Sequence, residues 1–122
     1  DDAMTARAVR MGRRIGLLAS NTSTLAPTRH LLQEQAAAAG TETVICEELV
    51  EGALDALLAG DVATHDMRVA AGARELAPQV DVLVLAQASM ARALPLMADL
   101  PVPVLASPRS AIEALRARLS AG

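Results

Sequence analysis

The chain has 122 residues, 52% hydrophobic and 20% charged, a balance typical of one globular domain and not of a disordered chain. Its net charge of -3 and its lack of Phe, Tyr and Trp exclude a broad basic surface and an aromatic platform for bases, so we expect no nucleic-acid partner. Because no apolar run reaches transmembrane length and the charged N-terminus is unlike a signal peptide, we expect a cytoplasmic protein with no membrane partner.

Two kinds of hydrophobic pattern alternate along the chain. Helical periodicity, with apolar side chains three or four positions apart, covers residues 3–11, 25–39, 49–59, 62–76, 89–98 and 109–119. Short apolar runs of the strand type cover residues 14–19, 42–46, 80–86 and 102–106. Strands that alternate with helices in this way predict a parallel sheet with right-handed crossovers.

The two segments with the clearest patterns define the expected layers. Residues 80–86, VDVLVLA, are continuously apolar, which is typical of a strand buried on both faces of a parallel sheet. In the helix predicted over 25–39, Gly40 provides the stop, and the inward stripe is Leu25, Leu32, Ala36 and Ala39. We therefore predict one α/β domain over residues 1–122, with a four-stranded parallel sheet, helices on both faces and a lead-in helix within residues 1–12.

Polar residues follow three of the predicted strands at their carboxyl ends, where open parallel sheets bind ligands. They are Ser20, Asn21, Thr22, Ser23 and Thr24 after the first strand, Gln87, Ala88 and Ser89 after the third, and Ser107 after the fourth. Small hydrogen-bonding side chains next to free N–H groups at a helix start suit a carboxylate or phosphate. The same residues are ordinary helix caps, so both interpretations remain open.

Other chemistries find less support. The first loop contains no glycine, which argues against a dinucleotide site although Glu47 and Glu48 follow the second predicted strand. The single cysteine, Cys46, ends an apolar run without a nearby base and is interpreted as a structural thiol. His30 and His65 are expected on polar or boundary faces of their helices without a local Ser or Asp partner, so we assign them no catalytic role and predict no metal site.

Three segments carry a family resemblance in their order and spacing. RIGLLASNTSTLAPTRHLL, DVLVLAQASMARALP and VPVLASPRSAIEALRARL resemble the aspartate/glutamate/hydantoin racemase superfamily, and the resemblance covers nearly the whole chain. It implies two similar α/β halves, an active site between them and no cofactor. It also implies one cysteine from each half, and these two thiols take and return the α-proton of a bound carboxylic acid.

This chain resembles the second half of such a protein. A first half with its own cysteine would precede Asp1, and an opening at Asp1 instead of Met favours a fragment. Gln87 stands where the family's second-half cysteine would follow the L-A pair. Because an amide cannot shuttle a proton but can donate to an oxyanion, the isolated chain is expected to be inactive, with Gln87 as an oxyanion donor. Cys46 does not match the catalytic position.

The resemblance therefore implies part of a cofactor-independent, racemase-like isomerase that acts on a small amino acid, a hydantoin or a related carboxylate. The expected substrate-binding residues are Ser20, Asn21, Thr22, Ser23, Thr24, Ala88, Ser89 and Ser107. The alternatives are a non-catalytic carboxylate-binding module and a lyase of the same superfamily. The expected partner is a missing first-half domain or another copy of the chain, since an uncovered apolar face would favour association. This interpretation requires the polar turns after the first and third strands to meet.

Overall fold

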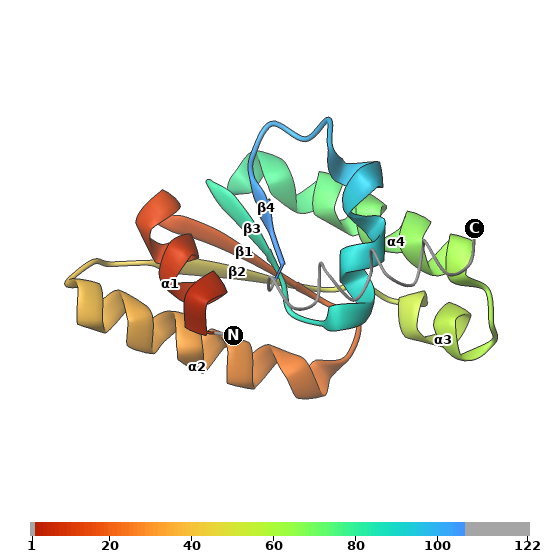
Figure 1. Ribbon diagram of the computed structural model, residues 1–122, viewed down its shortest axis with the longest axis horizontal. Coiled ribbons are helices and arrows are strands. Elements are labelled where there is room, and N and C mark those ends of the chain that lie inside the picture. Colours follow the sequence, from red (N-terminus) through yellow and green to blue (C-terminus); the bar gives the residue numbers. More distant parts are fainter. Residues whose placement is uncertain (1, 107–122) are drawn as a thin grey trace.

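The computed structural model describes residues 2–106 and contains alternating helices and strands (Figure 1). The helices are α1 (Asp2–Met11), α2 (Thr22–Ala39), α3 (Ala53–Leu58) and α4 (Val62–Leu76), with the 3-10 helices η1 (Ala77–Gln79) and η2 (Ala88–Met97). The strands are β1 (Arg14–Ala19), β2 (Val44–Leu49), β3 (Val82–Leu85) and β4 (Val104–Leu105). Ser107 and the helix predicted over 109–119 lie outside the described residues.

The four strands form one parallel sheet in the order β2-β1-β3-β4, which confirms the predicted fold class. The chain leaves β1 for β2 on one side and then crosses back to place β3 on the other side of β1. The connections therefore reverse direction between β1 and β3. In open α/β sheets, this reversal leaves a crevice beyond the carboxyl ends of the two strands.

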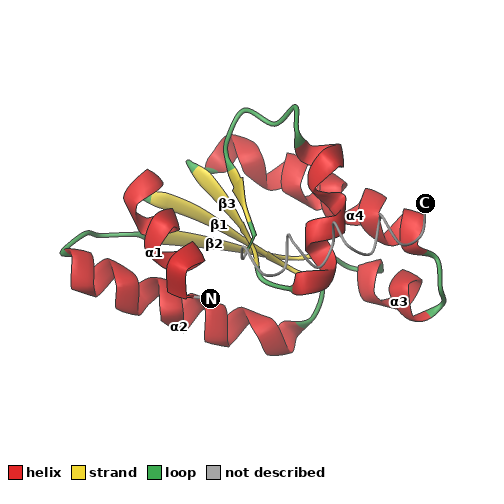
Figure 2. Ribbon diagram, in the orientation of Figure 1, coloured by secondary structure: helices red, strands yellow, loops and turns green. Residues whose placement is uncertain are grey.

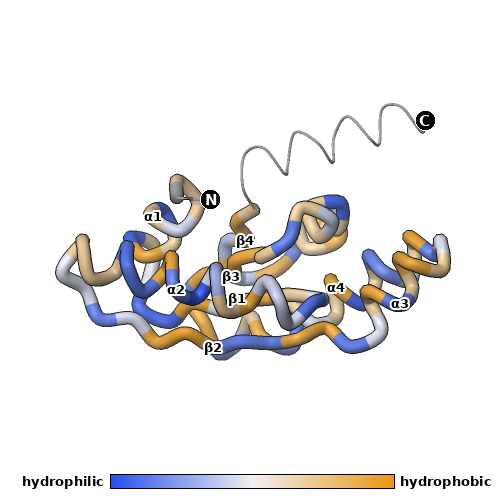
Figure 3. Tube along the Cα trace, turned by 90° about the horizontal axis from the view of Figure 1, so that it is seen from below, coloured by the Kyte–Doolittle hydropathy of each residue, from blue (hydrophilic) through white to orange (hydrophobic). Residues whose placement is uncertain are grey.

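Helices cover both faces of the sheet, as predicted (Figure 2). Successive strand residues point to opposite faces, so Leu17 and Val84 pack in the core under α1 and α2, whereas Leu18, Leu83 and Leu85 pack under α4 and η2. With no aromatic side chain available, both cores are built from aliphatic residues, methionine and alanine. Figure 3 shows hydrophobic residues in α3 as well, and Leu58 there is 77% exposed.

The start of α2 lies three residues earlier than the sequence pattern indicated. Thr22, Ser23 and Thr24 form its first turn instead of a loop, and Asn21 is the N-cap. Ser and Thr are tolerated there because the first turn leaves backbone N–H groups without intrahelical partners. The predicted end is confirmed, since Gly40 adopts the left-handed conformation at φ 68°, but the inward position assigned to Ala39 is wrong because this residue is exposed.

Other element boundaries in the structure also differ from those predicted. The second strand covers Val44–Leu49 and not 42–46, because each residue from Val44 to Leu49 pairs with β1. The region 89–98 is a 3-10 helix, Ala88–Met97, with Pro95 inside it. The remaining segments predicted within residues 2–106 are correct in type, with shorter strands in the third and fourth positions. Within residues 2–106, no helix combines the length and apolarity required to cross a bilayer.

Candidate functional site

The candidate site lies at the carboxyl ends of β1 and β3, at the reversal of the sheet order. Ser20 follows β1 directly and is buried, with 7% of its surface exposed. Gln87 follows β3 by two positions and is half-buried. The first turn of α2 begins beside them, so backbone N–H groups and the positive end of the helix dipole face the same point.

The side chain of Gln87 joins the two turns. Its Oε1 atom lies 2.6 Å from the backbone N of Ser20, 3.0 Å from the backbone N of Asn21, 3.2 Å from Oγ of Ser20 and 3.3 Å from Oγ1 of Thr24. We call the first three of these atoms, the two backbone N atoms and Oγ of Ser20, the α2 donor cluster. The polar turns after the first and third strands therefore meet, and they do so through direct hydrogen bonds.

The partners determine which way the Gln87 amide faces. A backbone N–H can only donate, so the group placed against Ser20 and Asn21 must be the amide oxygen. The hydroxyl of Thr24 lies closer to the carbonyl of Asn21, at 2.9 Å, and its single proton is better placed there than on Gln87. In this arrangement the oxygen of Gln87 is an acceptor, and only its Nε2 group is left to donate to another molecule.

The side chain of Asn21 caps the N-terminus of α2. The backbone of Asn21 is extended, with φ -137°, and its Oδ1 accepts from the backbone N of Ser23 at 3.0 Å. This is the ordinary N-cap arrangement, so the Asn21 side chain is accounted for by capping. The neighbouring Ser20 is different, because it is buried and contacts Gln87 instead of capping the helix.

The remaining predicted site residues are not brought into this contact. Thr22 and Ser23 lie exposed on the first turn of α2, and Ala88 is exposed at the start of η2. Ser89 is half-buried and has no hydrogen bond to another described residue through its side chain. Ser107 is outside the described residues. The contact thus consists of Ser20, Asn21, Thr24 and Gln87.

These four residues can bind an anionic oxygen but cannot move a proton. Two backbone N–H groups and a serine hydroxyl on one oxygen are the kind of donors that stabilise a carboxylate or an oxyanion. Hydroxyl and amide side chains have no acid or base function near neutral pH. Proton transfer at this place would need a group from elsewhere.

The two glutamates of β2 have structural partners. Glu47 forms an ion pair with Arg29 of α2. Glu48 lies half-buried on the opposite side of the strand, facing Glu75 of α4. Burial, followed by the negative charge and the hydrogen bond of Glu75, raises the pKa of the Glu48 carboxyl above its ordinary value.

The variant Glu48→Gln is expected to be more stable than the parent at neutral pH. A carboxyl whose pKa is raised by folding binds its proton more tightly in the folded state, so its charged form destabilises the protein above that pKa. The gain should stay below about 1 kcal/mol, since solvent screens a half-exposed pair. It should vanish as the pH falls below about 4.3, the pKa of an unperturbed glutamate, because the carboxyl is then protonated in both the folded and the unfolded state.

Urea unfolding of the two proteins at several pH values, followed by far-UV circular dichroism, measures this difference. The matched control is Glu51→Gln, which removes the same charge from an exposed position two residues beyond β2. A gain that grows on acidification would contradict the assigned role of Glu48.

The prediction that His65 lies on a polar or boundary face of its helix is wrong. His65 is completely buried in α4, and its Nδ1 atom lies 2.8 Å from Oδ1 of Asp66, the next residue in the chain. Its other ring nitrogen, Nε2, is buried without a hydrogen-bond partner. His30, by contrast, is exposed, as expected for a polar face.

Sequence reasoning missed the His65–Asp66 pair because adjacent residues on a helix do not usually face each other. One signal was present: His65 precedes the buried Val69 by four positions and continues its apolar stripe. Cys46 is half-buried on β2 and packs against the core under α4, in agreement with its interpretation as a structural thiol.

Within the described part of the chain, no group of three or more His, Cys, Asp or Glu side chains is placed to hold a metal ion. No protein-family model matches the chain, and a search of curated protein sequences also finds no match. The resemblance to the racemase superfamily therefore rests on the three sequence segments that carry it.

Proposed function

We propose that this chain is the carboxylate-binding part of a racemase-like, cofactor-independent isomerase that acts on a small amino acid, a hydantoin or a related carboxylate. The observation that carries the proposal is the convergence of the α2 donor cluster on a single oxygen, Oε1 of Gln87. These donors lie at the reversal of the sheet order, the place where open α/β sheets bind ligands.

In this proposal Gln87 occupies the position that a ligand carboxylate takes. The amide oxygen is neutral, whereas a carboxylate is charged, and hydrogen bonds to a charged acceptor are roughly twice as strong. A carboxylate can therefore compete for the backbone N–H groups of Ser20 and Asn21 despite the cost of displacing the side chain. Once displaced, Gln87 can donate its Nε2 protons to the same ligand, which is the donor role that the family resemblance assigns to it.

The proposal includes a partner that supplies the base. None of the residues in contact with Oε1 of Gln87 can accept a proton from carbon, and the related family builds its site from two halves. A first-half domain with a cysteine, or a second copy of this chain, is the proposed partner. The isolated chain would then bind a carboxylate without racemising it.

A second candidate is a carboxylate-binding module that performs no chemistry. It is favoured by one observation: within residues 2–106, none of the side chains whose residues donate hydrogen bonds to Gln87 is titratable near neutral pH. The two candidates share the binding step and differ in whether the bound molecule then exchanges its α-proton, so binding and proton exchange must be measured separately.

Binding is tested by nuclear magnetic resonance of the 15N-labelled chain during titration with acetate, the smallest carboxylate available. The amide signals of Ser20 and Asn21 are expected to move most, since their N–H groups would exchange an amide oxygen for a charged one. Acetamide at the same concentration is the neutral control and should move them less. If acetate leaves both signals in place, the proposed function is wrong.

Catalysis is tested by incubating both enantiomers of amino acids and hydantoins with the protein in D2O. Loss of the α-proton signal is followed by proton nuclear magnetic resonance. Exchange above the buffer rate that disappears in Ser20→Ala supports the isomerase. A chain that binds acetate at Ser20 and Asn21 yet gives no exchange, either alone or together with the proposed partner, is a binding module.

A further inference from the structure

A second polar site lies between α4 and η2, apart from the α2 donor cluster. The two helices enclose a surface groove of about 360 Å³, which is within the range of pockets that hold small molecules. Its lining residues are Ala63, Asp66, Met67, Arg92, Pro95 and Leu96. Four of these six are apolar, and Met67 and Leu96 are 66% and 44% exposed, so the groove offers an apolar wall that is open to solvent.

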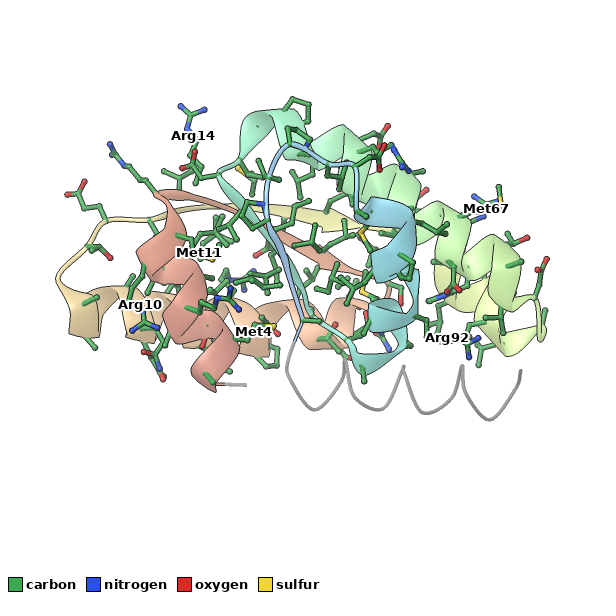
Figure 4. All side chains as sticks on the ribbon, turned by 45° about the horizontal axis from the view of Figure 1, so that its top comes forward. Met4, Arg10, Met11, Arg14, Met67 and Arg92 are labelled. Carbon is green, nitrogen blue, oxygen red and sulfur yellow. The ribbon has the colours of Figure 1, made fainter. Side chains whose placement is uncertain are left out.

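The groove contains one acid and one base that are not paired with each other. Asp66 comes from α4 and Arg92 from η2, and no ion pair or hydrogen bond joins them. Figure 4 shows the Arg92 side chain leaving η2 on the side of α3 and α4. Both residues line the same groove without pairing, so the Arg92 guanidinium and the Asp66 carboxylate can each contact a molecule bound there.

Arg92 lacks the partners that other arginines of this chain have. Its Nε atom is buried and has no hydrogen-bond acceptor among the described residues, and its guanidinium forms no ion pair with them. Ion pairs do form elsewhere, namely Arg13 with Glu42, Arg29 with Glu47 and Arg74 with Asp99. The charge of Arg92 is therefore not neutralised by an ion pair with a described residue, and a ligand carboxylate in the groove would pair with it.

Asp66 is held in place with part of its carboxylate unused. Oδ1 faces Nδ1 of the fully buried His65 at 2.8 Å, so Nδ1 carries the ring proton in the neutral imidazole. This contact orients the carboxylate, whose side chain is 17% exposed. Its second oxygen, Oδ2, has no partner among the described residues and is left to accept from a ligand.

We propose that this groove binds a zwitterionic α-amino acid with an apolar side chain. The ligand carboxylate would bind the guanidinium of Arg92, the ammonium group would bind Asp66, and the side chain would lie on Met67, Pro95 and Leu96. A ligand with only a carboxylate would be repelled by Asp66, and one with only an ammonium group by Arg92. The site is separate from Gln87 and does not depend on the proposed isomerase.

Calorimetric titration of the 122-residue chain with L-leucine tests the proposal, using 4-methylpentanoate and 3-methylbutylamine as analogues that lack one charge each. Leucine is expected to bind at least about tenfold more tightly than either analogue, because each analogue loses a charge-assisted contact and keeps a repulsive one. This comparison uses the parent protein and does not depend on whether any variant folds.

The variants then locate the site. Arg92→Gln and Asp66→Asn should each weaken leucine binding by about tenfold or more, and Asp66→Asn keeps an oxygen for His65. The matched control is Arg13→Gln, which breaks the exposed pair with Glu42 outside the groove and should leave the affinity unchanged. Circular dichroism confirms that each variant is folded.

Three results would overturn the inference. The first is a lack of leucine binding to the parent chain at millimolar concentrations. The second is equal binding of leucine and the two analogues, which would indicate an apolar surface without charge recognition. The third is leucine binding that folded Arg92→Gln and Asp66→Asn proteins retain in full, because the ligand would then lie elsewhere.

Discussion

Replacement of Gln87 by alanine is expected to lower the free energy of unfolding by about 1–3 kcal/mol. The substitution removes the one acceptor shared by the backbone N–H groups of Ser20 and Asn21 and by the hydroxyl of Ser20. Ser20 is buried, so water replaces the lost oxygen only in part. Urea unfolding followed by far-UV circular dichroism measures the loss, since the chain has no Trp or Tyr to report by fluorescence.

Acetate should recover part of this loss. A ligand that binds only the folded state stabilises it in proportion to the logarithm of its concentration, so the alanine variant should gain more from acetate than the parent does. Acetate should raise the free energy of unfolding of the variant more than acetamide does, because a charged acceptor binds the same donors more strongly. Equal effects of acetate on parent and variant would mean that the α2 donor cluster does not bind a carboxylate.

A matched control separates this effect from the general cost of removing a glutamine. Gln79 is exposed in η1, and Gln79→Ala should change the free energy of unfolding by no more than about 0.5 kcal/mol.

A further variant, Gln87→Glu, places a carboxylate of the chain itself next to the α2 donor cluster. It should be at least as stable as the parent at neutral pH and should gain nothing further from acetate.

Leu83→Ala is expected to lower the free energy of unfolding by about 2–5 kcal/mol, because Leu83 is completely buried on β3. Gly16→Ala is also expected to destabilise, by about 1–3 kcal/mol. A Cβ atom at Gly16 would lie 2.7 Å from Cδ2 of Leu83 and 2.8 Å from Cδ2 of Leu76, closer than van der Waals contact allows. Gly16 and Leu83 face each other across the β1–β3 pair.

In the double variant that combines Leu83→Ala with Gly16→Ala, the free energy of unfolding should fall by less than the sum of the two single decreases. Truncation of Leu83 removes one of the two atoms that the new methyl group would strike, and the methyl group fills part of the cavity, so the coupling should reach about 0.5–3 kcal/mol. Thermal and urea unfolding of all four proteins measure it. Leu32→Ala is the control: Leu32 is equally buried but lies in the core under α2, so its combination with Gly16→Ala should be additive. Additivity of the Leu83 pair would contradict the packing described.

The family resemblance and the structure suggest different roles for Gln87. The resemblance implies the position of a catalytic thiol, whereas in this structure the side-chain oxygen of Gln87 accepts hydrogen bonds from the neighbouring turn. This contact is sufficient to explain the residue as a structural link between β3 and α2. The same contact identifies which backbone groups a carboxylate would have to capture, and the acetate experiments distinguish the two roles.

The groove between α4 and η2 is lined by the titratable side chains of Asp66 and Arg92. His65 contacts Asp66 from the core, and among the described residues Nε2 of His65 and Nε of Arg92 are buried without hydrogen-bond partners. Buried polar atoms are nearly always satisfied in folded proteins, which makes the two exceptions informative.

The sequence by itself determined the layers of this protein. Continuous apolar runs predicted β1 and β3, helical periodicity predicted α1, α2 and α4, and Gly40 marked a helix end that the structure confirms. Such features depend on residues close together in the chain, where local sterics and periodicity act. The polar residues after the strands could be identified for the same reason, since strand ends follow from the apolar pattern.

Only the tertiary structure decided how those polar residues are used. The length of β2 came from its pairing with β1, the burial of His65 from the packing of α4, and the acceptor role of Gln87 from donors 66 and 67 residues away in the chain. A hydrogen bond across such a separation depends on where folding places both partners. Residue type and spacing therefore predicted where a site could lie, and the packed sheet alone determined which atoms meet there.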